Sequence, residues 1–405
     1  PEAAAPPGEE DPLATVLEAG AAKPARANRR HIALLVLAHM SNDAYHGFLS
    51  PLMPLLARKL ELSLSMVGLL SSAHGITADM GQLLFGYFAD RLRKGWLMAL
   101  GPLCGALLAF MFFAPNFWAL FGLLLVGGVG SACFHPVATV LANQSAGDRK
   151  GLGVSLYISG GRLGMAAGAA LATFLATRFG PEGVIFGVIP GLVFGTLLLF
   201  LAPPFRGAGG LAHQDLGATL KSLRVVFRPL FRLWVVNLCR TSVTMTVNAF
   251  VPLYVVKTGG TVAQGGRTVT FFLLAATVGG IYGGHLSDRL GRRWVTIASL
   301  VVGTPLIVLG FLLPDPYRTA ALMAAGAAFY AQMGVSVTYA QEIAPAHAAL
   351  VSSFMLGVMW FAASGSMVVV GALADAFGLA ATLPVYCAVV GGVGLALSFG
   401  LPRFR

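Results

Sequence analysis

The sequence predicts an all-α integral membrane protein, with twelve transmembrane helices in two pseudo-symmetric six-helix bundles. Three observations support this fold class: the composition, the lengths of the apolar runs and an internal repeat. Of the 405 residues, 57% are hydrophobic and 11% are charged, whereas soluble domains carry roughly 25% charged residues. So few charges cannot cover the surface of a soluble fold. The composition therefore argues against a cytosolic enzyme, a secreted disulfide scaffold and a disordered chain.

Twelve apolar runs follow a polar N-terminal segment. Residues 1–30 are rich in Ala, Pro and Glu, which predicts a disordered cytoplasmic tail. Each run approaches the length that crosses about 30 Å of hydrocarbon. We place the spans at 31–57, 66–90, 95–113, 116–143, 149–179, 182–203, 231–256, 268–288, 293–313, 317–343, 349–377 and 380–401. The predicted parts are an N-terminal bundle at 31–203, a cytoplasmic linker at 204–230, a C-terminal bundle at 231–401 and a cytoplasmic C-terminus at 402–405.

An internal repeat relates the two predicted bundles. The segment GYFADRLRKGW at 86–96 matches GHLSDRLGRRW at 284–294 at five identical positions, and the ninth position is a cation in both. The same offset of 198 residues pairs Pro54 with Pro252 and Phe179 with Phe377. Two parallel halves of this kind place a substrate site at their interface, near the middle of the membrane.

Lysine and arginine indicate the orientation of the chain. If the tail, the linker and the C-terminus share one side, that side holds 19 of the 27 Lys and Arg residues and the opposite side holds 6. Both termini should therefore be cytoplasmic. The same bias accounts for the net charge of +11 without a nucleic-acid partner. Arginine outnumbers lysine by 21 to 6, which suggests a GC-rich bacterial genome and hence the inner membrane.

The sequence shows no motif for catalysis. The four cysteines lie inside apolar runs, with neither a disulfide framework nor the spacing of metal ligands. No nucleophile–base pair or phosphate-binding loop stands out. We therefore expect no enzyme activity, no catalytic residues, no metal and no cofactor other than a proton gradient as the driving force.

The repeated segment resembles a known family signature. Gly-x-x-x-Asp-Arg-x-Gly-Arg-Arg at 284–293 resembles the motif of the major facilitator superfamily, and the first copy departs from it at Arg93. A narrower resemblance is to the fosmidomycin-resistance group of drug exporters. It rests on HMSNDAYHGFLSPLMPLL at 39–56, GSACFHPVATVLA at 130–142, and Arg240-Thr241 in the seventh span. These resemblances imply the major facilitator fold, a monomer and a small-molecule substrate.

The first span carries candidates for proton coupling. Ionisable residues inside a membrane are costly and are candidates for function. His39, Asp43 and His46 are spaced i, i+4 and i+7, so they share one helical face. A carboxylate flanked by imidazoles can bind and release a proton, and Asp79 of the second span is a further candidate. The alternatives are an Asp43 held in a fixed ion pair with an arginine, a solvated His39 and an Asp79 that serves as a hydrogen-bond hub.

Two arginines inside the spans are candidates for binding an anion. Arg162 lies in the fifth span and Arg240 in the seventh. A guanidinium stays charged and can bind a phosphonate or a carboxylate through two parallel hydrogen bonds. The alternative is a structural ion pair with Asp43 or Asp79. The other candidates for substrate contact are His135, Asn42 and Tyr45.

The two copies of the repeated motif are candidates for a conformational role. By resemblance, cations here reach acidic groups of the facing bundle and form a cytoplasmic latch that favours the outward-open state. The alternative is that these charges only determine topology. The latch candidates are Asp90, Arg91, Asp288, Arg289, Arg292 and Glu342.

These features predict a secondary active transporter. We expect a proton-coupled antiporter that exports a small, anionic, phosphonate-like compound or drug by alternating access, as in antibiotic resistance. Uptake or exchange of an organic anion or phosphate ester is an alternative that fits the same arginines. The expected partners are the substrate, protons and the lipid bilayer.

Overall fold

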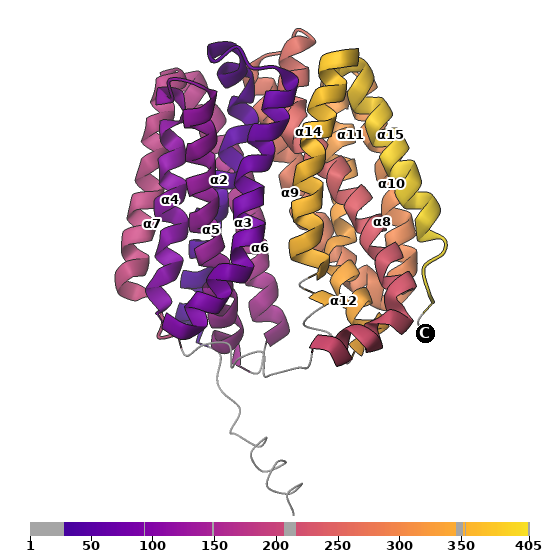
Figure 1. The fold of residues 1–405 in the computed structure, drawn as a ribbon. Coiled ribbons are helices and arrows are strands. Elements are labelled where there is room, and N and C mark those ends of the chain that lie inside the picture. The colour runs from indigo at the N-terminus through magenta and orange to yellow at the C-terminus, as the bar shows by residue number, and fades with distance from the viewer. Residues whose placement is uncertain are drawn as a thin grey trace, which may run out of the picture.

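The computed structural model describes residues 28–92, 94–147, 150–205, 216–345, 351–352 and 354–403. Within these ranges every regular element is a helix, and the helices form two groups that stand side by side (Figure 1). The N-terminal half consists of α2 (Arg29–Lys59), α3 (Leu64–Leu92), η1 (Gly95–Ala99), α4 (Leu100–Ala106), η2 (Leu107–Phe113), α5 (Phe117–Ser145), α6 (Lys150–Phe179), η4 (Pro181–Gly187) and α7 (Val188–Leu201). The C-terminal half consists of α8 (Leu216–Lys257), α9 (Val262–Leu290), α10 (Arg292–Leu312), α11 (Tyr317–Ala331), α12 (Met333–Ile343), η6 (Phe354–Val358), α14 (Met359–Phe377) and α15 (Leu379–Ser398).

Each predicted span coincides with one helix or with a consecutive series of helices. Counted over the described residues, nine of these segments are long and apolar enough to cross a membrane. The other three are α2, α3 and α8. Asp43, Asp79 and Arg240 lie on these helices, and polar residues of this kind lower the hydropathy of a span. The fold is therefore all-α and consistent with twelve spans, and these three helices carry several of the predicted site residues.

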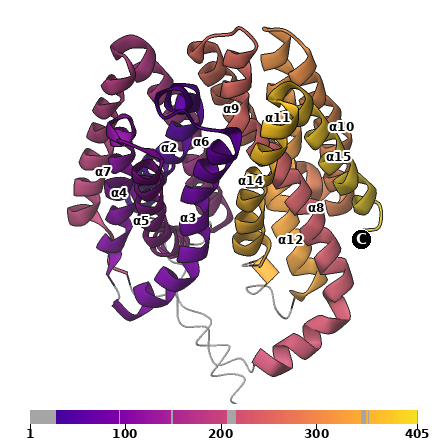
Figure 2. The same cartoon turned by 45° about the horizontal axis from the view of Figure 1, so that its top comes forward.

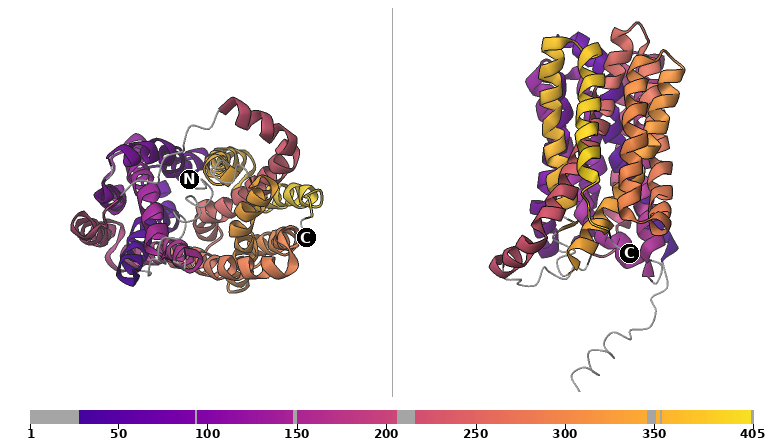
Figure 3. Two further views of the ribbon diagram at one scale, coloured as in Figure 1. Left: turned by 90° about the horizontal axis from the view of Figure 1, so that it is seen from below. Right: turned by 90° about the vertical axis from the view of Figure 1, so that its right-hand side faces the viewer.

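Helix α8 begins earlier than predicted. It starts at Leu216, so the second part of the predicted linker at 204–230 is helical and leads away from the bundle (Figures 2 and 3). Cations and apolar residues alternate here at helical spacing, which makes the segment amphipathic. A search for continuous apolar runs does not detect such a helix. Residues 206–215 of the linker and 1–27 of the predicted tail at 1–30 lie outside the described residues. The tail prediction extends too far, because α2 already begins at Arg29.

Small residues bring α6 against α2. A Cβ atom on Gly164 would lie 2.2 Å from the carbonyl oxygen of Met40, and one on Gly168 would lie 1.8 Å from that of Ala44. Glycine at these positions lets the two backbones approach closely, as in other membrane helix pairs. α2 consequently lies inside the N-terminal half, in contact with α5 and α6.

The two halves meet along α3 and α14, α6 and α9, and α2 and α8. Asp375 of α14 accepts hydrogen bonds from the backbone N–H groups of Leu64, at 2.7 Å, and Ser65, at 2.8 Å. A Cβ atom on Gly68 would lie 2.2 Å from the carbonyl oxygen of Met367. The beginning of α3 and the end of α14 are thus in tight contact. In the predicted orientation, this contact lies at the extracellular end of the molecule.

Candidate functional site

The predicted residues of the first span gather inside the N-terminal half. His39 is only 7% exposed, so the alternative of a solvated His39 is wrong. Gly161 of α6 makes room for the side chains of His39 and Asp43. A Cβ atom at Gly161 would lie 2.4 Å from Nε2 of His39 and 2.6 Å from Oδ2 of Asp43. Close packing of α6 on α2 therefore positions this pair.

The backbone of α6 orients His39. Its Nδ1 lies 2.8 Å from the carbonyl oxygen of Tyr157, and the two rings stack with 4.2 Å between their centroids. A carbonyl oxygen only accepts, so Nδ1 carries the hydrogen and the neutral ring has its lone pair on Nε2. This Nε2 lies 3.2 Å from Oδ2 of Asp43. Two acceptors at this separation are stable only with a cation between them, either a proton or a metal ion.

His135 of α5 completes this group. Its Nε2 lies 3.7 Å from Oδ1 of Asp43, and the donor atoms of His39, Asp43 and His135 all lie within 4.8 Å of one another. These are the described residues best placed to hold a metal ion. The sequence showed no metal-ligand spacing because His135 follows the other two far along the chain. Asp43 pairs with histidines here, and its ion pairs in the described structure include neither arginine.

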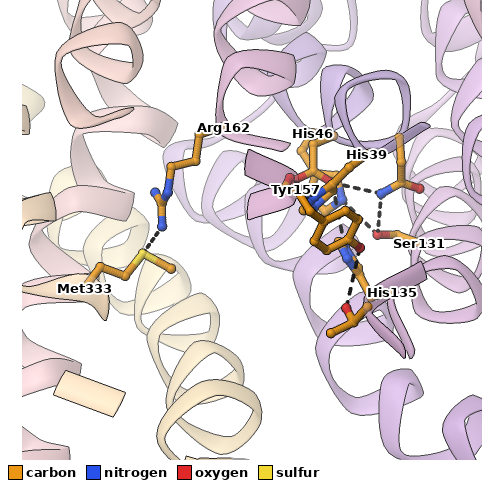
Figure 4. Close-up of polar contacts among 10 residues, drawn as sticks. His39, His46, Ser131, His135, Tyr157, Arg162 and Met333 are labelled. Atoms are coloured by element: carbon orange, nitrogen blue, oxygen red, sulfur yellow. Dashed lines mark hydrogen bonds and ion pairs between the residues drawn. The ribbon is translucent and has the colours of Figure 1, made fainter. Parts of the chain in front are cut away.

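A series of hydrogen-bonded side chains lies beside this group. Asn42 donates to Oδ1 of Asp43 at 2.9 Å and to Oγ of Ser131 at 3.2 Å. Ser131 also lies 3.0 Å from Nε2 of His46. The ring of His46 meets that of His74 from α3 edge to face, with 3.9 Å between centroids. Asn42 and His46 are therefore connected through Ser131. Figure 4 shows His46 beside Ser131.

Arg240 is a buried cation with incomplete hydrogen bonding. Its exposure is 1%, and its Nη2 donates to Oγ1 of Thr241 at 2.7 Å. Within the described residues, its Nε and Nη1 have no hydrogen-bond partner. Its Cζ lies 5.8 Å from the ring centroid of Tyr330. The predicted alternative of an ion pair with Asp43 or Asp79 is not what the structure shows.

Arg162 reaches the same tyrosine from the opposite half. Its Cζ lies 4.7 Å from the ring centroid of Tyr330, and its Nη2 donates to the sulfur of Met333. Figure 4 shows Arg162 directed toward Met333 and away from the histidines. A thioether is a weak acceptor, so Met333 is a weak partner for this guanidinium. Two guanidinium groups, one from each half, thus converge on one aromatic ring.

Tyr45 does not lie with the two arginines. The structure therefore does not support its predicted contact with the substrate. Its hydroxyl donates to the carbonyl oxygen of Gly187 at 2.8 Å, and the residue is 2% exposed. Its ring packs where a Cβ atom on Gly105 would lie, 2.6 Å away. α2 is covered by neighbours on several faces, so polarity along the helix did not reveal which face meets the other half.

Asp79 lies apart from the histidine group. It is partly buried on α3, and the described structure shows no hydrogen bond or ion pair for it. A hydrogen-bond hub is therefore not observed. A Cβ atom on nearby Gly75 would lie 2.6 Å from Oγ of Ser364 in α14 and 3.7 Å from Oδ2 of Asp79. The carboxylate consequently lies beside the contact between the two halves.

The second copy of the motif forms ion pairs inside its own half. Arg292 of α10 contacts Asp288 of α9 at 2.5 Å and Glu342 of α12 at 3.1 Å. Glu342 therefore pairs within its own half in this conformation. The latch to the facing bundle was expected for the outward-open state and stays a prediction. Arg91 and Arg289 are exposed, and the side chain of Asp90 lies outside the described part of the structure.

Several residues of the site were not predicted. His74 and Ser131 could have been singled out as polar residues in apolar spans. Tyr157 acts through its backbone carbonyl, which leaves no signal in a sequence. Tyr330 and Met333 resemble ordinary core residues, so only the fold places them beside the arginines.

Comparisons with known proteins agree with this architecture. The sequence model of the Major Facilitator Superfamily matches residues 35–355. The chain is 27% identical over 360 residues to an uncharacterized MFS-type transporter, YfnC, of Bacillus subtilis (strain 168), which covers 86% of this chain and 88% of that protein. It is 24% identical over 383 residues to the fosmidomycin resistance protein of Escherichia coli (strain K12), covering 90% and 91%.

Solved structures show the same fold. A bacterial homolog of the human lysosomal transporter Spinster, in an inward-facing and occupied conformation, superposes with a TM-score of 0.73 at 16% identity, covering 94% of this chain and 95% of that one. The nucleoside transporter NupG gives a TM-score of 0.71 at 16% identity, covering 92% and 98%. The curated relatives are transporters and not enzymes. The chain therefore belongs to the Major Facilitator Superfamily of multi-pass membrane transporters.

Proposed function

We propose that this transporter exports a small organic anion, of the phosphonate or carboxylate class, in exchange for protons across the bacterial inner membrane. The observation that carries the proposal is Arg240, a guanidinium buried to 1% exposure with two nitrogen atoms unpartnered among the described residues. Burying a charge without a partner is costly. A site that keeps this charge is suited to a ligand that supplies the missing acceptors.

The surroundings of Arg240 favour an anion with at least two oxygen atoms. A guanidinium binds phosphonate or carboxylate through two parallel charge-assisted hydrogen bonds. Arg162 approaches the same Tyr330 ring from the other half. An anion between the two arginines would offset their mutual repulsion and draw the halves together. The name of the Escherichia coli relative, a fosmidomycin resistance protein, is consistent with a substrate of this class.

In the proposed mechanism, alternating access moves the two halves relative to each other. α3 with α14 and α6 with α9 are equivalent helix pairs under the 198-residue repeat, and both connect the two halves. Rocking of two such halves around a central site exposes that site to each side in turn. The residues between the halves, Arg162 and Arg240, would change surroundings with this motion.

We assign proton coupling to Asp79. Asp43 is engaged by two histidines and an asparagine, whereas Asp79 has no such partner among the described residues. An ionised carboxylate without a cation is costly within a membrane. Its position beside the α3–α14 contact means that opening this contact changes its access to water. Protonation of Asp79 would therefore be linked to the state of the two halves.

Direction of transport is tested with inside-out membrane vesicles and labelled fosmidomycin as the probe. An exporter should accumulate the probe in the lumen when the lumen is acidic and should fail to do so when the gradient is reversed. An uptake transporter would instead accumulate the probe in right-side-out vesicles under an acidic exterior. That second result would reject export, and a lack of any response to the pH gradient would reject proton exchange.

A further inference from the structure

Three lone-pair donors converge at one point of the N-terminal half. Nε2 of His39 and Nε2 of His135 lie 3.2 and 3.7 Å from the two carboxylate oxygens of Asp43. The ligating atoms of the three residues all lie within 4.8 Å of one another. A tetrahedral metal ion with ligand bonds of about 2.1 Å holds its ligand atoms roughly 3.4 Å apart. The two histidine–carboxylate distances, one to each oxygen of Asp43, are close to this value. The complete set of ligating atoms lies within 4.8 Å, so small side-chain rotations would bring it to the geometry of a bound ion.

The residues around these donors hold them in the orientation of metal ligands. The Nδ1–H of His39 donates to the carbonyl oxygen of Tyr157 at 2.8 Å, which leaves Nε2 as the ligating atom. Metal-bound histidines are usually oriented by a hydrogen bond of this kind. Asn42 donates to Oδ1 of Asp43 at 2.9 Å and fixes the carboxylate. Gly161 leaves space beside the pair, where a Cβ atom would lie 2.4 Å from Nε2 of His39.

We propose that His39, Asp43 and His135 form a binding site for a divalent first-row transition-metal ion such as Zn²⁺. Imidazole nitrogen favours these ions, whereas Mg²⁺ and Ca²⁺ favour sites made of oxygen atoms. Three protein ligands leave at least one coordination position for water or for an oxygen atom of a bound molecule. The side chains of Asp43 and His135 are 15% and 20% exposed, which gives an ion access to the site.

The site is independent of the proposed anion site. Arg240 belongs to α8 of the other half, so metal binding does not require that the chain transports an anion. Loss of metal binding with intact fosmidomycin transport, or the reverse, would separate the two proposals. The competing occupant of the site is a proton shared between His39 and Asp43.

Cobalt binding to the purified full-length chain, without an affinity tag, tests this proposal. We expect one Co²⁺ per chain, detected by its visible absorption and displaced by Zn²⁺. His39→Ala and His135→Gln should each weaken binding at least about tenfold, since each removes one of three ligands. His285→Ala is the matched control, because His285 is exposed on α9, outside the group, and should leave binding unchanged.

A thermal measurement guards against variants that merely misfold. Zn²⁺ should raise the unfolding temperature of the wild type and of His285→Ala, as any ligand of the native state does. At the same Zn²⁺ concentration it should raise that of His135→Gln by clearly less, provided that this variant elutes as a folded species. Absence of stoichiometric cobalt binding, or binding that survives both substitutions, would overturn the metal site and leave a proton as the occupant.

Discussion

The first helices of the two halves, α2 and α8, occupy equivalent positions in the repeat but carry opposite chemistry. An offset of 198 residues places His39 against Asn237, and Asp43 against Thr241. The same offset places Asn42 against Arg240. In α2 these positions hold groups that bind cations, whereas in α8 they hold a permanent cation. One scaffold would thus carry the proposed cation site in one half and the proposed anion site in the other.

The fourth helices of the two halves show the same divergence. Gln332 takes the position of Phe134, and Met333 takes that of His135. Gln332 donates to Asn237 at 3.2 Å and accepts from Ser299 at 2.9 Å, so amide and hydroxyl groups satisfy one another in the C-terminal half. This network includes Asn237, one turn before Arg240 on α8, but it does not include the Arg240 guanidinium. Gln332 thus has hydrogen-bond partners for its amide nitrogen and oxygen, whereas Nε and Nη1 of Arg240 have none among the described residues. This contrast supports the proposal that Arg240 binds the ligand.

The largest effect should come from Asp79→Asn. The change keeps the size of the side chain but removes its ability to carry a proton. Accumulation of fosmidomycin driven by a pH gradient should fall at least about tenfold, a loss equivalent to about 1.4 kcal/mol or more. Exchange of labelled for unlabelled probe without a gradient should continue. The control is Glu182→Gln, at an exposed position in η4, which should transport normally. If Asp79→Asn still accumulates the probe under a pH gradient, Asp79 is not the proton-binding residue.

Arg240→Leu should stabilise the ligand-free protein. Removing a buried charge that lacks partners avoids its desolvation cost. Replacing whole buried ion pairs by apolar residues of similar volume can gain about 1–4 kcal/mol, and we expect a gain of the same sign here. The unfolding temperature in detergent should therefore rise. Arg228→Leu, at an exposed position on α8, serves as the control and should change it little. A lower unfolding temperature for Arg240→Leu would indicate that the guanidinium is a structural partner.

Asp375→Asn should loosen the extracellular contact between the halves. The carboxylate accepts two backbone N–H groups at the beginning of α3, and losing its charge there should cost about 1 kcal/mol. That shift changes the ratio of open to closed states about fivefold. Distances between spin labels at Glu182 and Tyr317 should lengthen in a larger fraction of molecules.

The repeat provides a matched control for this substitution. Thr177 is the equivalent of Asp375, and its hydroxyl bonds to the carbonyl oxygens of Thr173 and Phe174, both within α6. Thr177→Val should leave the label distances unchanged. Equal behaviour of the two variants would show that the Asp375 carboxylate does not hold the contact closed.

The smallest effect is expected from Tyr45→Phe. This change removes one buried hydrogen bond to Gly187, which should destabilise the protein by about 0.5–1.5 kcal/mol. Anion affinity should not change, because Tyr45 packs within the N-terminal half. If anion affinity falls while stability stays unchanged, Tyr45 contacts the substrate after all.

The sequence predicted most of the helices because span length and apolar composition are local properties. It did not predict the early start of α8 at Leu216, since that segment is amphipathic. The i, i+4 spacing of His39 and Asp43 was enough to place them together. The convergence of His135, and of Tyr330 with the two arginines, depends on packing between helices and leaves no local pattern. Packing between helices also decides that Tyr45 faces its own half, which is why its predicted substrate contact is not seen.

Equilibrium binding of fosmidomycin to the purified protein tests whether Arg240 binds the anion. Hydrogen bonds to a charged group contribute about 1.5–3 kcal/mol each, so Arg240→Gln should raise the Kd at least about tenfold. Arg228→Gln should leave it unchanged. Equal affinities for the wild type and Arg240→Gln would show that the Arg240 guanidinium does not bind the anion.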